Sequence, residues 1–311
     1  MITKNNNIYI IMYHYVREIK KSKYPSLKGL EYKDFKNQIK YFSKNFNILS
    51  NNDFIEIMNS KKLPKKKSII LTFDDGYKDH YKYVYPFLLK NKLPANFYPP
   101  IQAVKNKKVL DVNKIHFILE KEHNRDKIIK LIFFYSKKYF NKSFTDKELK
   151  AANFKHRYDD PKTILVKRLL QHYIPEIYRE KILNKIFSKI LNTNEEDFSK
   201  KLYINTTELK ELYKDNFTIG SHGYNHSWLE KLNNSEQEQE ISRSINYFKK
   251  INVYKSNFSV CFPYGSYNDF TLKILKKYKV KYGLASNVGS INNKNINDKF
   301  TFPRFDTNDF K

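Results

Sequence analysis

The sequence of 311 residues contains a single cysteine, a single tryptophan and only seven glycines. With Cys261 alone, an internal disulfide is excluded. No apolar run reaches the roughly 20 residues that a membrane-spanning helix requires. The N-terminal segment also lacks the long apolar core and the small-residue cleavage site of a signal peptide. These absences favour a cytoplasmic protein, either free or attached peripherally to the inner face of the membrane.

Acidic residues are scarce as well, with 32 Asp and Glu against 59 Lys and Arg, which gives a formal net charge of +27. Such an excess can indicate nucleic-acid binding, because Lys and Arg neutralise phosphates. Here the excess is spread along the chain and no arginine-rich run or nucleic-acid motif is present, so we predict no nucleic-acid partner. Two explanations stay open: a lysine- and asparagine-rich composition with a solvated basic surface, and attraction to anionic lipid headgroups.

The apolar pattern indicates strands that alternate with helices. Runs rich in apolar, β-branched or aromatic residues predict strands at 8–13, 69–73, 95–98, 217–219, 258–262, 282–285 and 300–305. Helical periodicity predicts helices at 34–44, 78–91, 206–214, 236–250 and 268–278. This alternation favours a parallel α/β sheet or barrel, whose active site lies at the carboxyl ends of the strands. We therefore predict an α/β fold, a distorted and incomplete (β/α) barrel of about seven strands.

One long segment, at about 101–204, interrupts the alternation. It carries apolar residues three and four positions apart, mixed with Lys and Glu, which predicts several amphipathic helices. The apolar stripes are typical of a protein core rather than of a membrane anchor. We predict one domain over residues 1–311, interrupted by this helical insertion beside the barrel mouth, where it could cap or extend a substrate groove.

Two polar motifs follow apolar runs and together suggest a metal site. The first places Asp74 and Asp75 before a glycine, and the second supplies two imidazoles, His222 and His226. Hydrolytic zinc uses three protein ligands and keeps one position open for water, so two His and one Asp suffice. The two His are predicted to share one helical turn, and the spare aspartate could take a proton from the water. Each motif alone could be structural: an Asp-Asp-Gly turn, or a pair of histidines without a ligand role.

A third motif, Phe-Pro-Tyr-Gly at 262–265, completes a recognisable series. With Thr-Phe-Asp-Asp-Gly-Tyr at 72–77 and Ser-His-Gly-Tyr-Asn-His at 221–226, it resembles the successive motifs of the polysaccharide deacetylase family. That family is also called the NodB-homology fold or carbohydrate esterase family 4. Order and spacing match over roughly 200 residues once the insertion is left aside. The resemblance also implies the (β/α) barrel.

The resemblance assigns roles to individual residues. It implies that Asp74 is the general base and that Asp75, His222 and His226 hold a divalent metal, with zinc favoured. It further implies that the loop of Pro263, Tyr264 and Gly265 shapes the acetyl-binding pocket.

The chain departs from the family pattern in two places. Cys261 stands where the family often has an Arg that orients the catalytic Asp, and no histidine follows His226 to serve as general acid. The strand that ends at His14 resembles the opening of the circularly permuted branch that deacetylates poly-N-acetylglucosamine, so His14 becomes the candidate acid. Arg304 is the candidate replacement for the Arg. A buried structural histidine and a surface arginine are the respective alternatives.

The resemblance implies a metal-dependent hydrolase that removes N-acetyl groups from an amino sugar and releases acetate. The predicted substrate is an N-acetylated glycan or a lipid- or nucleotide-linked sugar, with an anionic membrane as a peripheral contact. Two alternatives stay open: another sugar amide or ester hydrolase with the same metal site, and a catalytically silent glycan-binding protein. The sequence does not determine the oligomeric state.

Overall fold

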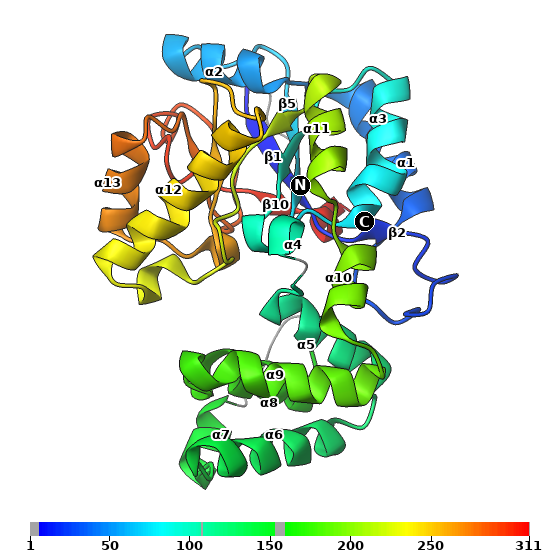
Figure 1. Cartoon of the computed structure of the whole chain (residues 1–311). Helices are drawn as coiled ribbons and strands as arrows, with labels where there is room; N and C mark the ends of the chain where they lie inside the picture. Colours follow the sequence, from blue (N-terminus) through cyan, green and yellow to red (C-terminus); the bar gives the residue numbers. More distant parts are fainter. Residues whose placement is uncertain (1–5, 107, 153–158, 311) are drawn as a thin grey trace. The chain divides into compact units, whose positions relative to one another are not determined.

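The computed structural model describes residues 6–106, 108–152 and 159–310 (Figure 1). Residues 1–5, on which part of the signal-peptide prediction depends, and residues 107 and 153–158 of the predicted insertion lie outside the described residues. The chain divides into two compact units. The first comprises Met1–Ile19, Lys28–Lys107 and Lys200–Lys311, and the second comprises Lys20–Leu27 and Lys108–Ser199. In the described ranges, no helix combines the length and the apolar character needed to cross a membrane.

All the strands of the first unit are short except two. They are β1 (Ile8–Tyr13), β2 (Val16–Arg17), β3 (Leu30–Glu31), β4 (Asn47–Ile48), β5 (Ser68–Asp74), β6 (Asn96–Tyr98), β7 (Thr218–Ile219), β8 (Val260–Cys261), β9 (Gly283–Leu284) and β10 (Phe305–Asp306). The two long strands, β1 and β5, pair in parallel along their whole common length. Each of the predicted strands is present, and β2, β3 and β4 are additional.

The parallel pairing runs around a ring. One sheet has the order β10-β1-β5-β6-β7, with β4 also pairing with β5. A parallel bridge from Ser221 to Val260 continues from β7 to the β8-β9 pair. A second parallel bridge, from Leu284 to Phe302, leads back to the segment that contains β10. The described ring thus contains β1, β5, β6, β7, β8, β9 and the 302–306 segment, which confirms a seven-stranded barrel, one strand short of the usual eight.

Helices follow the strands, as predicted. Those of the first unit are α1 (Tyr32–Asn45), α2 (Asn51–Ser60), α3 (Tyr85–Lys90), α4 (Ile101–Asn106), α11 (Thr206–Lys214), α12 (Asn234–Lys250) and α13 (Asp269–Lys277). The prediction of one helix over 78–91 needs a correction, because α3 is preceded by a π-helical turn, His80–Val84. Helix α2, which the sequence analysis missed, begins with a capping box between Ser50 and Asp53.

Alternation along the strands separates two cores. On β1 and β5, Ile8, Ile10 and Ile70 lie in the inner core together with residues from β6 and β9. Their neighbours in sequence, such as Tyr9 and Leu71, belong to the outer core between barrel and helices. Since side chains alternate along a strand, the inner series continues to His14, directly after β1, and to Asp74 at the end of β5. The carboxyl end of the barrel therefore receives polar side chains from an otherwise apolar inner face.

The second unit is helical, as predicted for the insertion. Its helices are α5 (Asp111–Lys121), α6 (Arg125–Phe140), α7 (Asp146–Ala152), α8 (Pro161–Arg168), η2 (Leu169–Tyr173) and α9 (Glu176–Leu191), and α10 (Glu195–Leu202) reaches its end. The predicted apolar stripes are core residues: Ile115, Ile118, Ile182 and Ile186 are buried. The first of the helices after residue 100, α4, belongs to the barrel unit, so the second unit is shorter than the 101–204 segment. The role of the insertion stays a prediction.

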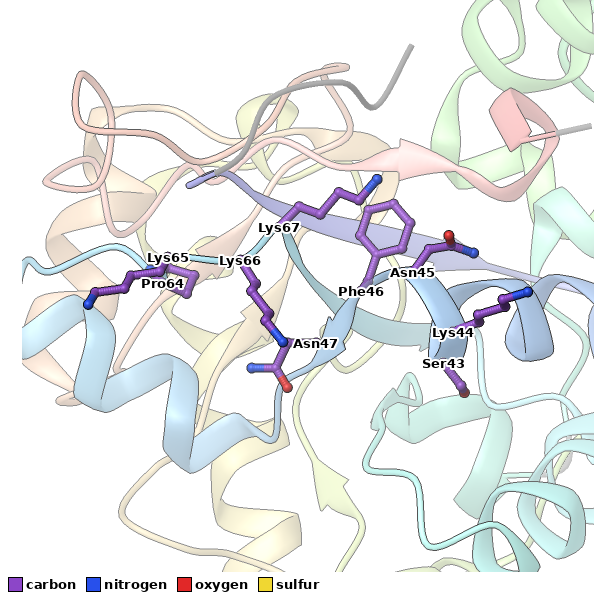
Figure 2. Close-up of a pocket in the computed structure, with 9 residues that line it drawn as sticks. All are labelled: Ser43, Lys44, Asn45, Phe46, Asn47, Pro64, Lys65, Lys66 and Lys67. Carbon is purple, nitrogen blue, oxygen red and sulfur yellow. The ribbon is translucent and has the colours of Figure 1, made fainter.

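A basic hollow of about 710 Å³ lies at the end of the barrel where β4 and β5 begin (Figure 2). It is lined by residues 43–47 and 64–67, and Lys67 directly precedes β5. Four of the lining residues are lysines, Lys44, Lys65, Lys66 and Lys67, and none is acidic. The hollow is at the opposite end of β5 from Asp74.

Candidate active site

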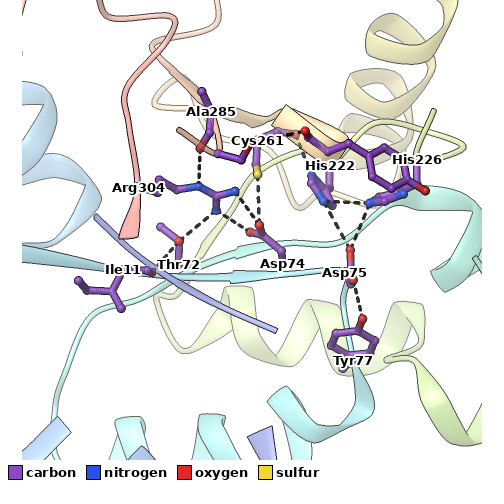
Figure 3. A network of polar contacts seen from close by, with 12 residues as sticks. Ile11, Thr72, Asp74, Asp75, Tyr77, His222, His226, Cys261, Ala285 and Arg304 are labelled. Carbon is purple, nitrogen blue, oxygen red and sulfur yellow. Dashed lines mark hydrogen bonds and ion pairs between the residues drawn. The ribbon is translucent and has the colours of Figure 1, made fainter. Parts of the chain in front are cut away.

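The carboxylate of Asp74 is held by a buried arginine. Arg304 places its two terminal nitrogens against the two oxygens of Asp74, Nη1 to Oδ1 at 3.0 Å and Nη2 to Oδ2 at 2.8 Å (Figure 3). The guanidinium is itself fixed, because Nε donates to the Ala285 carbonyl at 2.9 Å and Nη1 to Thr72 Oγ1 at 3.3 Å. Arg304 is 2% exposed and Asp74 1%. A surface arginine, the alternative for this position, is therefore wrong.

This pairing determines the charge state of Asp74. Burial raises the pKa of the Asp74 carboxyl, but the charges of Arg304 and His222 outweigh burial and hold the pKa below its ordinary value. Cys261, in place of the family's Arg, directs its thiol at Asp74 Oδ2 from 3.4 Å. The cation beside Asp74 is Arg304, from the 302–306 segment, which β9 separates from β8 in the ring.

Asp75 faces the two histidines instead of the arginine. Its Oδ1 is 3.5 Å from His222 Nε2 and 3.3 Å from His226 Nε2, and the two Nε2 atoms are 3.2 Å apart (Figure 3). Asp75 turns away from the line of β5 because its φ is +68°, in the left-handed region. Neighbouring aspartates therefore face different partners.

The triangle of donor atoms fits a metal ion. A tetrahedral zinc with ligands at about 2.0–2.2 Å would separate its donor atoms by about 3.3–3.6 Å. The distances among Asp75, His222 and His226 match this spacing. The imidazole of His222 is also oriented, because its Nδ1 lies 2.8 Å from the Cys261 carbonyl and leaves Nε2 for the ion.

A second group of ligand types, Asp74, His222 and Cys261, also lies close together. It fits an ion less well, since both oxygens of Asp74 already face the Arg304 cation. Burial also raises the pKa of the Cys261 thiol, which disfavours the thiolate that a metal needs. We therefore place the metal site at the first group.

The two histidines do not share a helical turn, which corrects the prediction from their spacing. Residues 221–226 form a bent loop in which Gly223 has a φ of +75° and His226 a φ of +63°. The buried carboxylate of Glu240, on α12, holds this loop. It accepts the backbone N–H groups of Tyr224 at 3.0 Å and Asn225 at 2.9 Å, and also the Asn225 side-chain amide. The loop shape depends on an acid 14 residues beyond His226, which spacing alone does not indicate.

The remaining predicted residues follow strands of the same barrel. Tyr13 pairs with Phe73 in parallel, so the residues that come next, His14 and Asp74, lie at the same end of the barrel. Burial raises the pKa values of Asp74 and Asp75, and the charge of His14 is among those that lower both. The Tyr264 ring is 4.7 Å from the His226 ring and stacks on Trp228 at 4.1 Å, between centroids. Tyr264 has a φ of +59° within the 3₁₀ turn Pro263–Gly265.

Sequence reasoning missed several contributors. Tyr77 donates its hydroxyl to Asp75, and His80 Nε2 lies 2.8 Å from the His14 carbonyl. Tyr77 is the last residue of the motif at 72–77, but the sequence alone assigns it no role. The sequence did contain a signal for Glu240. It is an acidic residue on the buried face of α12, beside apolar residues such as Ile241 and Ile245.

Comparison with known proteins gives the family. The family model described as polysaccharide deacetylase matches residues 61–124 and 188–283, which together are half of the chain. The chain belongs to the polysaccharide deacetylase family. The unmatched stretch between the two ranges falls within the predicted insertion, and the family predicted from the motifs is confirmed. A search of curated proteins found no match.

Solved structures of deacetylases share the fold over nearly the whole length. The deacetylase PplD of Streptococcus pyogenes, in complex with acetate, is 17% identical with a TM-score of 0.60, over 97% of this chain and 93% of that one. A de-N-acetylase from Aggregatibacter actinomycetemcomitans has 15% identity and a TM-score of 0.55, over 96% and 94%. IcaB from Ammonifex degensii has 14% identity and a TM-score of 0.55, over 97% and 91%. At such identities the similarity supports the barrel and its order of strands.

Proposed function

We propose that this polysaccharide deacetylase is a zinc-dependent hydrolase that removes N-acetyl groups from an amino sugar and releases acetate. The arrangement that carries the proposal is the triangle of Asp75, His222 and His226 with a second, arginine-paired carboxylate beside it. A metal site alone could be structural. The adjacent ionised carboxylate, which is not needed as a ligand, supplies the proton acceptor that hydrolysis requires.

Asp75, His222 and His226 would hold the ion in this proposal. Bound there, zinc would supply Lewis-acid polarisation of the acetyl carbonyl and would lower the pKa of water. Asp74 accepts the proton of the attacking water. Its pairing with Arg304 keeps it ionised and fixes the direction of its oxygens.

The departing amine and the developing oxyanion need their own partners. His14, on the β1 side of the pocket, protonates the amine as general acid. The Pro263–Gly265 turn that follows β8 carries Tyr264, whose ring lies 4.7 Å from the His226 ring between centroids. We assign the backbone N–H of Tyr264 as the donor to the oxyanion, while Pro263 and Gly265 shape the wall around the acetyl group.

The sugar is proposed from the family and its relatives. The family model is that of polysaccharide deacetylases, and one relative of the same fold is described as a de-N-acetylase. An N-acetylated glycan is therefore the proposed substrate, and a lipid- or nucleotide-linked N-acetyl sugar is the variant that a biosynthetic role would require.

The first experiment measures acetate release. Protein stripped of metal and reloaded with zinc is incubated with N-acetylglucosamine oligomers and with lipid- and nucleotide-linked N-acetyl sugars. We expect acetate release that depends on zinc, and the preferred substrate identifies the linkage. O-acetylated and N-formylated sugars in the same panel test the alternative hydrolase, which would be favoured if only these reacted. Tight zinc binding without turnover of any substrate would instead favour a silent glycan-binding protein.

A further inference from the structure

The two oxygens of the Asp75 carboxylate face different partners. Oδ1 faces the two imidazoles, whereas Oδ2 accepts the hydroxyl of Tyr77 at 2.5 Å (Figure 3). A free carboxylate can bind a cation through one oxygen or through both. The Tyr77 hydroxyl occupies the second oxygen, so only Oδ1 is presented to the metal.

The Tyr77 ring is itself fixed in place. It is completely buried and stacks on the ring of Tyr15 with centroids 4.1 Å apart and an angle of 27°. On the chain segment before α11, Tyr203 lies nearly parallel to it at 6.1 Å, and the backbones of Tyr77 and Tyr203 form a bridge. The Gly76 carbonyl accepts the Ile204 N–H at 2.9 Å nearby. A hydroxyl on so constrained a ring has little freedom to leave Asp75.

We propose that Tyr77 is a positioning residue that keeps Asp75 bound to the metal through a single oxygen. The proposal rests on the metal site proposed above. Its chemical purpose is to preserve open coordination: a chelating Asp75 would occupy a further position, which water and the acetyl carbonyl need. It also completes a set of supports, because His222 is oriented by the Cys261 carbonyl and the loop that carries His226 is held by Glu240.

The test replaces Tyr77 with Phe, which removes only the hydroxyl. Loss of an outer hydrogen bond to a ligand typically weakens metal binding by about 10- to 100-fold, so the zinc dissociation constant of Tyr77→Phe should rise by that factor in competition with a chromophoric chelator. X-ray absorption at the zinc edge should show one bound Asp75 oxygen in the wild type and a chelating carboxylate in the variant. A role in folding alone would change neither the distance nor the number of zinc-bound oxygens.

Tyr282→Phe is the matched control. Tyr282 is also a buried barrel tyrosine, and its hydroxyl donates to Asn51 rather than to any predicted ligand. The Tyr282→Phe variant should bind zinc with wild-type affinity. Equal zinc affinity in Tyr77→Phe and the wild type, or a chelating Asp75 in the wild type, would overturn the role of Tyr77. The wild-type spectrum decides even if the variant fails to fold. A wild type that binds no zinc would instead overturn the metal site itself.

Discussion

Asp74 and Asp75 are adjacent in sequence but belong to two differently built halves of the pocket. On the Asp74 half, the carboxylate faces a fixed cation, Arg304, and a thiol. On the Asp75 half, it faces two imidazoles and a tyrosine hydroxyl. The first environment keeps a carboxylate ionised but occupies both its oxygens, and the second leaves one oxygen for a metal. The two identical side chains thus differ in role because their neighbours differ. They point to different neighbours because Asp75, directly after β5, has a left-handed backbone conformation.

The largest expected effects on turnover come from substitutions that remove one key side chain from one half of the site and leave the other half intact. Asp74→Asn should keep zinc and lose about 10²- to 10⁴-fold in turnover, because an amide cannot accept the proton of water. His222→Ala should lose both zinc and turnover. Zinc content by metal analysis and acetate release on the same samples separate the two results. Substantial turnover by Asp74→Asn would contradict the assignment of the base.

A smaller effect is expected from Arg304→Lys, which keeps the charge but loses the two-nitrogen contact. Turnover at neutral pH should fall by about 10- to 100-fold while zinc stays bound, by analogy with other outer-shell contacts. The pH dependence has a definite sign. Burial raises the pKa of Asp74 and Arg304 lowers it, so a weaker contact lets the pKa rise. The base is then protonated at a higher pH, and the acid limb of kcat/KM moves upward.

The control for this variant is Arg125→Lys in the helical unit. Arg125 also donates from Nε to a threonine, Thr163, and from Nη1 to the Leu119 carbonyl, and both of these partners belong to the helical unit. Its kcat/KM profile should match that of the wild type. An unshifted acid limb in Arg304→Lys would show that Arg304 does not set the ionisation of Asp74.

The smallest effect should follow from Glu240→Gln, on the Asp75 half. Gln keeps one oxygen for the N–H groups of Tyr224 and Asn225, but its NH₂ group replaces the oxygen that accepts the Asn225 side-chain amide. Two donors then face each other, so the histidine loop loosens. We expect the zinc dissociation constant to rise about 10-fold, with turnover recovered at saturating zinc. Glu236→Gln, in the exposed capping box of the same helix, should leave zinc affinity unchanged. If both variants bind zinc as the wild type does, the loop does not depend on Glu240.

Much of the barrel could be predicted because its signals are local. Runs of apolar, β-branched or aromatic residues located every ring strand, and the polar residues Asp74 and His14 continue the inner series of β5 and β1. The partner of Asp74 came from the family resemblance, not from periodicity, because Arg304 is 230 residues away. Spacing suggested a helical turn for His222 and His226, and this prediction failed because a side chain on the following α-helix, Glu240 on α12, holds that loop.

Other predictions concern properties that the fold does not test. The cytoplasmic location, the contact with an anionic membrane, the linkage of the sugar and the absence of a nucleic-acid partner stay predictions. The roles of His14, Arg304 and the Pro263–Gly265 loop in catalysis stay proposals; the structure shows Arg304 against Asp74 and the Tyr264 ring against the His226 ring.

The separation between Asp74 and Arg304 has a consequence for biosynthesis. Arg304 is 230 residues further along the chain than Asp74. At a translation rate of roughly 5–20 residues per second, about 12 to 46 seconds pass between the synthesis of the two. During that time the nascent barrel lacks β10 and the Arg304 cation, which is first among the charges that offset the burial of the Asp74 carboxylate. A nascent chain that has not yet reached Arg304 therefore cannot form the two-nitrogen contact that fixes Asp74, so this half of the site is completed late in translation.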